Sequence, residues 1–236
     1  MSVTCLVTDA QAIGQTGAGW LVERLKGHRE ALIALSGGSA PQPIYKALSA
    51  LDPGEFKLTV VMADERLVPL NHTDSNFRQL MESLLHQWPV FRDGRCHVLT
   101  PPVDLPGDEA CRQYDTMLRT VLDTQPGGLS VAVLGCGPDG HTASLFPHHS
   151  ESRSCGLVEY VWNSPKPPAE RISLSETLLL QAEHILFVAR GKEKAEIVRT
   201  CIQDADAHRH LPAARISASH PSVTWLLDQE AASRMG

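Results

Sequence analysis

The chain alternates between short, continuous apolar runs and longer segments in which apolar residues recur every three or four positions. Four of the runs are β-branched or leucine-rich and have the length of buried β-strands; they span residues 31–36, 58–64, 129–135 and 184–190. The periodic segments predict helices over residues 41–51, 74–88, 108–124 and 191–203. This alternation predicts an α/β fold with a doubly wound, mainly parallel sheet and helices on both of its faces.

The length of the chain, 236 residues, fits one α/β domain, and we expect a single domain over residues 1–236. The proline-rich stretch at 163–175, "NSPKPPAERISLS", is the only candidate linker. Because strand and helix patterns resume after it, we place no domain boundary there.

The composition is that of a soluble globular protein, with 42% hydrophobic and 20% charged residues. A net charge of -6 argues against a general nucleic-acid or membrane-surface binder, since both need an electropositive face. No apolar run approaches the ~20 residues of a membrane-spanning helix, and the first residues lack a secretory leader pattern, so we expect a cytoplasmic protein. The six cysteines form no C-x-x-C pair and predict free, mostly buried thiols.

Glycine-rich or charged clusters follow all four predicted strands. They read "SGGSAP" at 36–41, "ADER" at 63–66, "GCGPDGH" at 135–141 and "ARGKEK" at 189–194. In a Rossmann-like sheet, ligands bind outside the carboxyl ends of the strands, where the chain order reverses. We therefore expect these four loops to face one crevice, with positive charge supplied locally if the ligand is an anion.

The first cluster, with Gly37, Gly38 and Ser39, is open to two interpretations. Glycines allow a ligand to approach the backbone, and free N–H groups at a helix start attract anions, which favours a phosphate site. A tight strand-to-helix turn capped by Ser39 explains the same residues equally well. The P-loop and dinucleotide fingerprints are both missing from this cluster.

The second cluster contains Asp64, Glu65 and Arg66. Three successive charges can simply be the solvated end of a strand. Alternatively, Arg66 provides a fixed positive fork for an oxyanion or phosphate. Spacing alone does not decide between these interpretations.

The third cluster is the most specific, because it places Asp139 and His141 in a glycine-rich turn at the end of a strand. Histidine is the usual general base near neutral pH, and a neighbouring carboxylate can fix its tautomer and orientation. We therefore predict that His141 is functional. Ser144 is not predicted to be a nucleophile, because no G-x-S-x-G elbow surrounds it.

The remaining candidate cations follow later in the chain. Arg171 comes after the prolines, while Lys192 and Lys194 open a helix, where a phosphate could offset their unfavourable interaction with the helix dipole. Exposed lysines are the alternative interpretation. The histidines at 148, 149, 208 and 210 lack the spacing of a known zinc site, so no metal is expected.

Taken in order, these clusters resemble the 6-phosphogluconolactonases, whose superfamily also contains glucosamine-6-phosphate deaminase. The motifs "LSGGSAP", "ADERLVPLNHTDSNF", "LGCGPDGHTASLFP", "ERISLS" and "GKEKAEI" carry the resemblance from about residue 31 to residue 200. The chain departs from the family pattern at Ala40, where threonine is frequent, at Cys136, where a bulkier apolar residue is frequent, and at His148, where glycine is common.

The resemblance implies a cytoplasmic, cofactor-free esterase that hydrolyses 6-phospho-D-glucono-1,5-lactone in the oxidative pentose phosphate pathway. We expect a monomer or a homodimer. By similarity, His141 would activate water with Asp139 beside it, and Arg66 would face the developing negative charge. The substrate and its phosphate would be held by residues Gly37, Gly38, Ser39, Asp64, Arg171 and Lys194.

Two other functions remain as alternatives. Glucosamine-6-phosphate deaminase shares the "DGH" loop, but its loop continues to a glutamate before proline, where this chain has Phe146 before Pro147. It also has tyrosine where this chain has Arg66. A non-catalytic sugar-phosphate sensor would need a DNA-reading module, and only one helix-like segment precedes the first predicted strand near residue 31.

Overall fold

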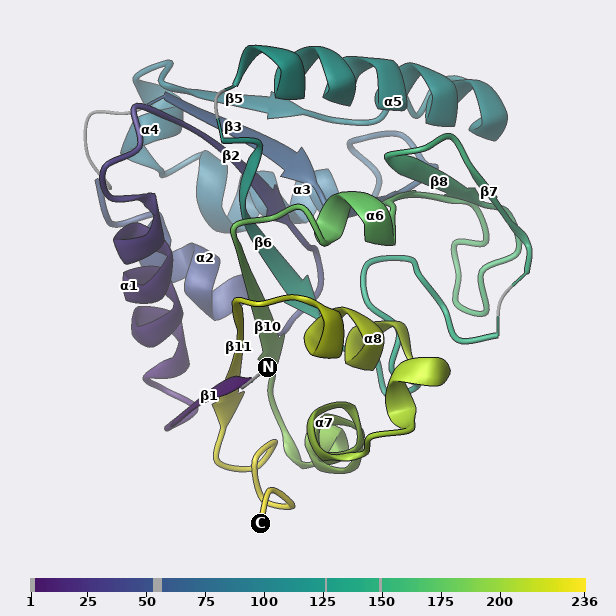
Figure 1. Cartoon of the computed structure of the whole chain (residues 1–236). Helices are drawn as coiled ribbons and strands as arrows, with labels where there is room; N and C mark the ends of the chain where they lie inside the picture. Colours follow the sequence, from purple (N-terminus) through teal and green to yellow (C-terminus); the bar gives the residue numbers. More distant parts are fainter. Residues whose placement is uncertain (1–2, 53–56, 126, 149) are drawn as a thin grey trace.

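A seven-stranded, all-parallel sheet forms the centre of the molecule (Figure 1). The computed structural model describes residues 3–52, 57–125, 127–148 and 150–236. The strands lie in the order β1 (Thr4–Thr8), β11 (Val223–Asp228), β10 (His184–Ala189), β6 (Leu129–Gly135), β2 (Glu30–Leu35), β3 (Lys57–Met62) and β5 (Cys96–Leu99). The predicted doubly wound α/β architecture is thereby confirmed.

Helices cover both faces of this sheet. One face packs against α1 (Ile13–Leu25), α2 (Gln42–Leu48), α3 (Asn76–Leu80), the π-helix η1 (Met81–Leu85) and α4 (Pro89–Arg92). The other packs against α5 (Gly107–Thr124), α6 (Glu176–Leu179), α7 (Ala195–Gln203) and α8 (Pro212–Ser219). Short 3₁₀ turns, η2 (Lys192–Lys194) and η3 (Ala207–Arg209), flank α7.

Because both faces are covered, successive residues of a central strand enter opposite cores. In β6, Val131 and Val133 pack with the α1 side, while Ala132 and Leu134 pack with the α5 side. This explains why the central strands read as continuous apolar runs.

Two sequence predictions need correction. The first strand is β1, at Thr4, and not the run near residue 31; β1 is an edge strand that is only partly buried and therefore lacks a continuous apolar pattern. The helix predicted over 74–88 is divided into α3 and the π-helix η1. Sequence periodicity also missed β5, the opposite edge strand, and β11.

A second, antiparallel sheet was not anticipated. It has the order β4 (Asp64–Arg66), β9 (Arg171–Leu174), β8 (Val158–Val161) and β7 (Ser152–Ser154). The end of the proline-rich stretch is therefore a strand, and Arg66 lies opposite Arg171 in the β4–β9 register. This small sheet brings two segments about a hundred residues apart to the same side of the crevice.

The chain order reverses between β2 and β6. From β2 the sheet grows outward through β3 and β5, and from β6 it grows in the opposite direction through β10 and β11. The loops that leave β2 and β6 at their carboxyl ends therefore diverge, and such a switch point is where open α/β sheets bind ligands.

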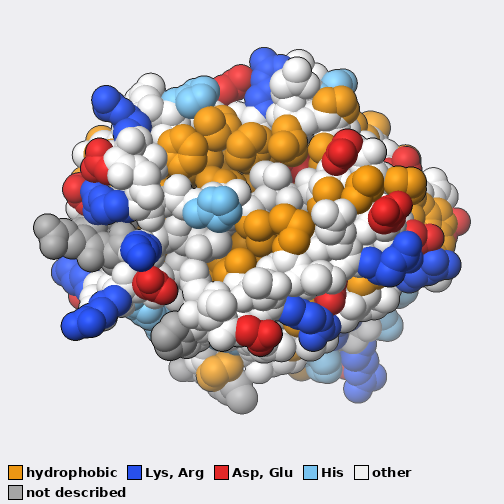
Figure 2. Space-filling view, turned by 90° about the horizontal axis from the view of Figure 1, so that it is seen from above, with side chains coloured by type: hydrophobic (Ala, Val, Ile, Leu, Met, Phe, Trp, Pro, Cys, Tyr) orange, Lys and Arg blue, Asp and Glu red, His pale blue; other side chains and the backbone are white. Residues whose placement is uncertain are grey.

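The surface carries mixed charge on the face seen from above. Lys and Arg side chains alternate with Asp and Glu around its rim, and hydrophobic side chains gather near its centre (Figure 2). None of the helices within the described ranges combines the length and the apolarity that a membrane span requires.

Candidate active site

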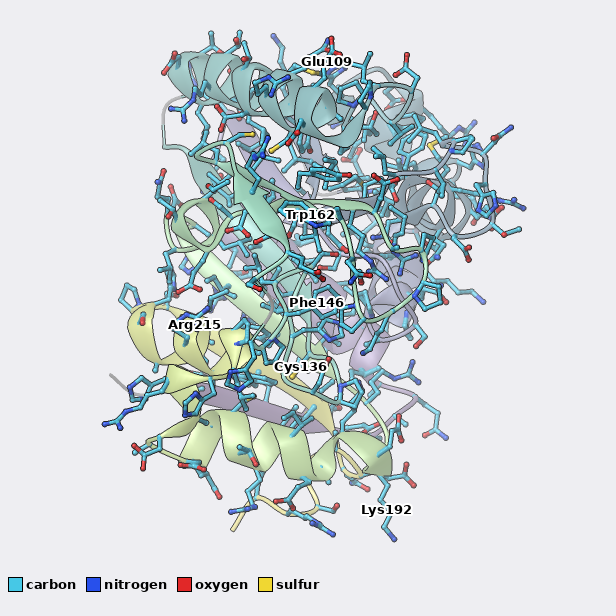
Figure 3. The ribbon with its side chains drawn as sticks, turned by 90° about the vertical axis from the view of Figure 1, so that its right-hand side faces the viewer. Glu109, Cys136, Phe146, Trp162, Lys192 and Arg215 are labelled. Atoms are coloured by element: carbon cyan, nitrogen blue, oxygen red, sulfur yellow. The ribbon has the colours of Figure 1, made fainter. Side chains whose placement is uncertain are left out.

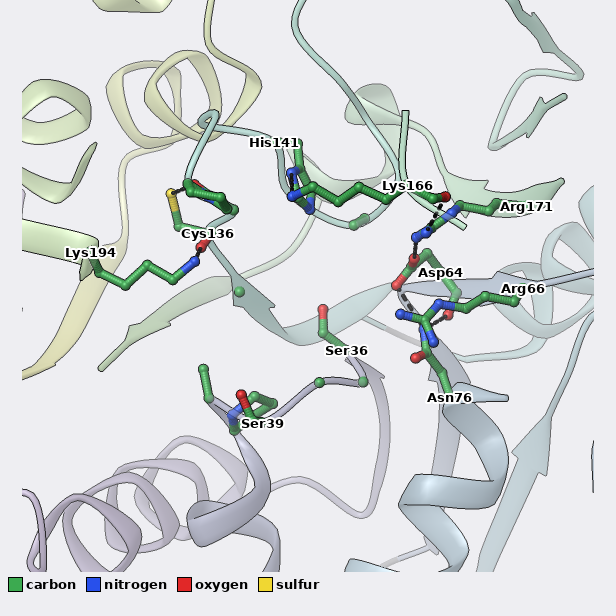
Figure 4. A pocket seen from close by; sticks show the side chains of 18 of the residues that line it. Ser36, Ser39, Asp64, Arg66, Asn76, Cys136, His141, Lys166, Arg171 and Lys194 are labelled. Carbon is green, nitrogen blue, oxygen red and sulfur yellow. Dashed lines mark hydrogen bonds and ion pairs between the residues drawn. The ribbon is translucent and has the colours of Figure 1, made fainter. Parts of the chain in front are cut away.

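A cavity of about 310 Å³ lies at the switch point (Figure 4). All four loops that follow the predicted strands contribute to its wall, through residues 36–41, Asp64 and Arg66, residues 135–138 with His141, and Lys194. The expectation that these loops face one crevice is confirmed. The segment before β9 adds Lys166, Pro167 and Arg171.

His141 and Asp139 form a hydrogen-bonded pair in the loop after β6. Asp139 Oδ1 contacts His141 Nδ1, so Nε2 is the ring nitrogen left to accept a proton. A Cβ atom at Gly137 would lie 2.0 Å from His141 Nδ1, so only glycine allows the ring to pack this closely. The His141 side chain is 16% exposed, and its ring centroid lies 4.7 Å from that of Phe146.

Lys166 is a third member of this group that sequence analysis did not identify. Its Nζ lies 3.4 Å from His141 Nδ1 and 3.6 Å from Asp139 Oδ1. Although burial alone would raise the pKa of Asp139, the hydrogen bond with His141 and the charges of His141 and Lys166 hold that pKa well below its usual range. Asp139 is therefore an anion that can stabilise an imidazolium.

Arg171 is buried and organises the Lys166 segment. Its Nε donates to Pro168 O at 3.1 Å, and its Nη2 donates to Lys166 O and Pro167 O at 2.9 and 3.2 Å. The side chain is only 5% exposed. These contacts commit most of its donors to the chain itself, so Arg171 fixes where Lys166 enters the cavity.

Asp64 is held by neighbours on three sides. Its Oδ2 accepts a hydrogen bond from Ser144 Oγ at 2.7 Å and lies 3.8 Å from Arg171 Nη1, and its Oδ1 accepts one from Asn76 Nδ2 at 3.1 Å. Ser144 is 1% exposed, and its hydroxyl is committed to Asp64 and Arg171. This burial agrees with the prediction that Ser144 is no nucleophile.

Glu65, between the two predicted site residues, is completely buried. Its carboxylate accepts backbone N–H groups of Arg66, Asn76 and Phe77, each at 2.7 Å, and the Ser75 hydroxyl at 3.1 Å. Burial raises the pKa of Glu65, and these three backbone hydrogen bonds oppose the rise. The interpretation of this cluster as a solvated strand end is therefore wrong for Glu65, which anchors β4 to the start of α3.

Arg66 lines the cavity beside this anchor. Its Nη1 donates to Asp74 O at 2.5 Å, whereas its Nε is shielded from solvent and has no hydrogen-bond partner within the described residues. The guanidinium is thus held at one end by the chain, with a donor that remains unsatisfied.

The loop of Gly37, Gly38 and Ser39 forms the opposite wall. A Cβ at Gly37 would lie 2.0 Å from Asn76 Oδ1, so this position requires glycine. The N–H of Gly38 donates to Gln79 Oε1 at 3.1 Å and is already used, whereas Ser39 lines the cavity.

Lys194 reaches the cavity from the turn before α7, and its Nζ donates to Cys136 O at 2.8 Å. Lys192 is exposed and points away from the body of the molecule (Figure 3). Of the two lysines, Lys194 therefore lines the cavity and Lys192 does not.

The cavity is locally positive in a chain of net charge -6. Arg66, Lys166, Arg171 and Lys194 line it, and Asp64 is the one acidic residue among the described lining residues. Within the described residues no three or more His, Cys, Asp or Glu side chains form a group suited to a metal ion; His149, considered in the sequence analysis, lies outside them. The site is suited to a small, anionic organic ligand.

The fold and this site define a sugar-phosphate enzyme family: the chain belongs to the family described as glucosamine-6-phosphate isomerases/6-phosphogluconolactonase, whose model matches residues 8–225. It is 34% identical to the 6-phosphogluconolactonase of Rattus norvegicus over 233 residues, which cover 94% of this chain and 86% of that protein. The resemblance inferred from the motifs is thereby confirmed.

Solved structures agree with this assignment. The 6-phosphogluconolactonase of Trypanosoma brucei superposes with a TM-score of 0.83 at 29% identity, covering 100% of this chain and 99% of that one. A monomeric glucosamine-6-phosphate deaminase superposes with a TM-score of 0.79 at 22% identity over 99% of this chain and 100% of that one. Because both activities occur on this fold, the fold alone does not distinguish them.

Proposed function

We propose that this chain hydrolyses 6-phospho-D-glucono-1,5-lactone to 6-phospho-D-gluconate in the oxidative pentose phosphate pathway, in the cytoplasm, without a covalent intermediate. The observation that carries the proposal is the Asp139–His141 pair at the edge of a cavity lined by Arg66, Lys166 and Lys194. The relatives named 6-phosphogluconolactonase support it.

In the proposed reaction, His141 Nε2 takes a proton from a water molecule as the water oxygen attacks the lactone carbonyl. The new imidazolium is stabilised by Asp139. Arg66 faces the negative charge that develops on the carbonyl oxygen. The tetrahedral intermediate then collapses with cleavage of the bond between the carbonyl carbon and the ring oxygen, and the imidazolium returns its proton to that oxygen.

These groups are sufficient to catalyse the hydrolysis of a lactone, which is an activated ester. General base catalysis contributes about 10²- to 10⁴-fold, and one preorganised oxyanion donor contributes about 10²- to 10³-fold. Lys166 lies on the Nδ1 side of the imidazole, next to Asp139, so we propose that it helps to keep Asp139 ionised.

The substrate phosphate is proposed to lie against Ser39 and Lys194, as the motifs imply. Arg171 and Asp64 also line the cavity, but their side chains are held by the protein itself, so we propose that they orient the surrounding groups. Gly37 and Gly38 also line the cavity, and we propose that their lack of side chains lets the substrate approach the backbone. The state of assembly, monomer or homodimer, and the extent of the domain over residues 1–236 stay predictions.

Deamination is less well supported by this site. Phe146, at the position where the deaminase pattern has glutamate, is 7% exposed and packs against the His141 ring. The only carboxylate among the described lining residues is Asp64, which is bonded to Ser144 and Asn76. A non-catalytic sensor has no need of the hydrogen-bonded pair of Asp139 and His141, so the sensor is less well supported than hydrolysis.

The test supplies fresh 6-phosphogluconolactone and glucosamine 6-phosphate to the purified chain in parallel assays. The lactone should be hydrolysed faster than it hydrolyses spontaneously, with no release of ammonia from the amino sugar. Ammonia release without lactone hydrolysis would assign the chain to the other activity of the family, and no turnover of either would favour the sensor.

A further inference from the structure

A second cavity, of about 560 Å³, lies beside Ser39, the last residue of the Gly37–Ser39 loop. It is formed between α2 and the π-helix η1, and the segment after β10 contributes to its wall. We call it the α2–η1 groove. Its polar and charged lining residues include Ser39, Lys46, Glu82, Ser83, Gln87 and Arg190.

The charge of this groove is positive. Lys46 and Arg190 form no ion pair within the described part of the chain, whereas Glu82, its one acidic lining residue there, is bonded to Arg78 Nε at 2.9 Å. Arg190 Nε is also shielded from solvent and has no hydrogen-bond partner there. Two unpaired cations and an unsatisfied guanidinium donor in one groove favour an anionic ligand.

The groove is connected to the candidate active site through shared contacts. Ser39 lines both cavities. Gln79 accepts a hydrogen bond from Gly38 N through its side chain, and its carbonyl accepts one from Ser83 Oγ at 2.7 Å. The groove wall is also π-helical, an uncommon geometry that recurs at functional sites.

We propose that the α2–η1 groove is a second anion site, which binds inorganic phosphate or the phosphoryl group of a small phosphorylated molecule between Lys46 and Arg190. The amide of Gln87 provides a polar contact that orients it, and Ser83, whose hydroxyl donates to Gln79 O, lies in the same wall. This site shares Ser39 with the cavity that contains His141, but Lys46 and Arg190 do not line that cavity, and the proposal does not depend on the reaction proposed there.

The test is an amide NMR titration of the full chain, with inorganic phosphate in one arm and glycerol 3-phosphate in the other. We expect saturable shifts at Ser83 and Gln87 in at least one arm, and the arm with the stronger response identifies the source of the phosphoryl group. The double variant Lys46→Gln/Arg190→Gln should weaken this binding by about ten-fold or more, because it removes both charged partners.

Two controls keep the result interpretable. Lys192→Gln removes a positive charge close to Arg190 in sequence but outside both cavities, and it should leave the affinity unchanged. Lactone turnover by the double variant should stay within about two-fold of wild type, which shows that the chain is folded. If that variant does not fold, Ser83→Asp, which adds a negative charge to the groove, should give the same loss of affinity.

Shifts at Ser83 and Gln87 that do not saturate in either arm would overturn the proposal. So would an affinity that is the same in wild type and in the groove variants. Neither result would affect the proposed lactonase activity, which is measured separately.

Discussion

The two walls of the candidate active site are built in opposite ways. On the His141 side, the side chains of His141, Asp139 and Lys166 are 16%, 37% and 39% exposed, and the group comes from loops. On the β4–β9 side, Arg171 and Asp64 are 5% and 8% exposed, and Glu65 is fully buried. Groups that exchange protons with water need access to it, whereas groups that fix geometry gain from burial and from saturated hydrogen bonds.

The largest effect is expected on the exposed wall. His141→Ala should lower the kcat for lactone hydrolysis by about 10³-fold, because the general base is lost, while phosphorylated ligands still bind. The measurement is the initial rate with fresh lactone after subtraction of spontaneous hydrolysis. Unchanged turnover would show that His141 is not the base.

The second-largest effect is expected for Asp139→Asn, which should lower kcat on the order of 10²-fold. An asparagine amide can donate to Nδ1 and so favour the tautomer that is protonated at Nε2, which cannot accept a proton. KM should change little, since Asp139 does not line the cavity. A rise in KM at constant kcat would assign Asp139 to substrate binding.

Lys194→Gln is expected to raise KM by about ten-fold with little change in kcat, because it removes a charged contact to the phosphate. Lys192→Gln is the matched control and should behave like wild type. If the variant keeps the wild-type preference for phosphorylated over plain gluconolactone, Lys194 is not a phosphate ligand.

Substitutions in the buried β4–β9 wall should change the free energy of unfolding. Glu65→Gln is expected to lower the free energy of unfolding by about 2 kcal/mol, because the new amide group faces backbone donors that the carboxylate accepted. Chemical denaturation measures the change, with Glu82→Gln, an exposed i,i+4 partner of Arg78, as the control within about 0.5 kcal/mol. Equal effects at both positions would contradict a special role for Glu65.

The smallest expected effect is a pH dependence from Asp139. Its pKa is lowered by folding, so its stabilising contribution is fully present above the ordinary value of 3.8 and is lost as the pH falls through the lower folded value. The stability difference between wild type and Asp139→Asn should therefore be constant near neutral pH and narrow below about pH 4. A difference that narrows near pH 6 would point to histidine titration instead.

The features that the sequence predicts are those set by neighbouring residues in the chain. His141 and Asp139 were found because they lie two residues apart in a turn with its own glycine signal. The central strands were found because burial on both faces leaves continuous apolar runs. These features are local, and a single sequence displays them directly.

The sequence did not predict the roles of Lys166 and Glu65, because both roles depend on contacts with distant parts of the chain. Lys166 comes within reach of His141 only because Arg171 binds the carbonyls of its segment. Glu65 resembles a surface charge until α3 supplies its N–H groups; the nearby helix start at Ser75 was the one available signal. The edge strands β1 and β5 are short and incompletely buried, so their patterns are weak.

The attachment of the Lys166 segment to Arg171 has an evolutionary consequence. Arg171 binds main-chain oxygens of Lys166, Pro167 and Pro168, and those oxygens are present whatever side chains follow the lysine. Side chains at neighbouring positions can therefore drift while the ammonium group stays in place. A deletion of one residue between Lys166 and Arg171, by contrast, would remove a carbonyl from reach and displace the ammonium group from the imidazole.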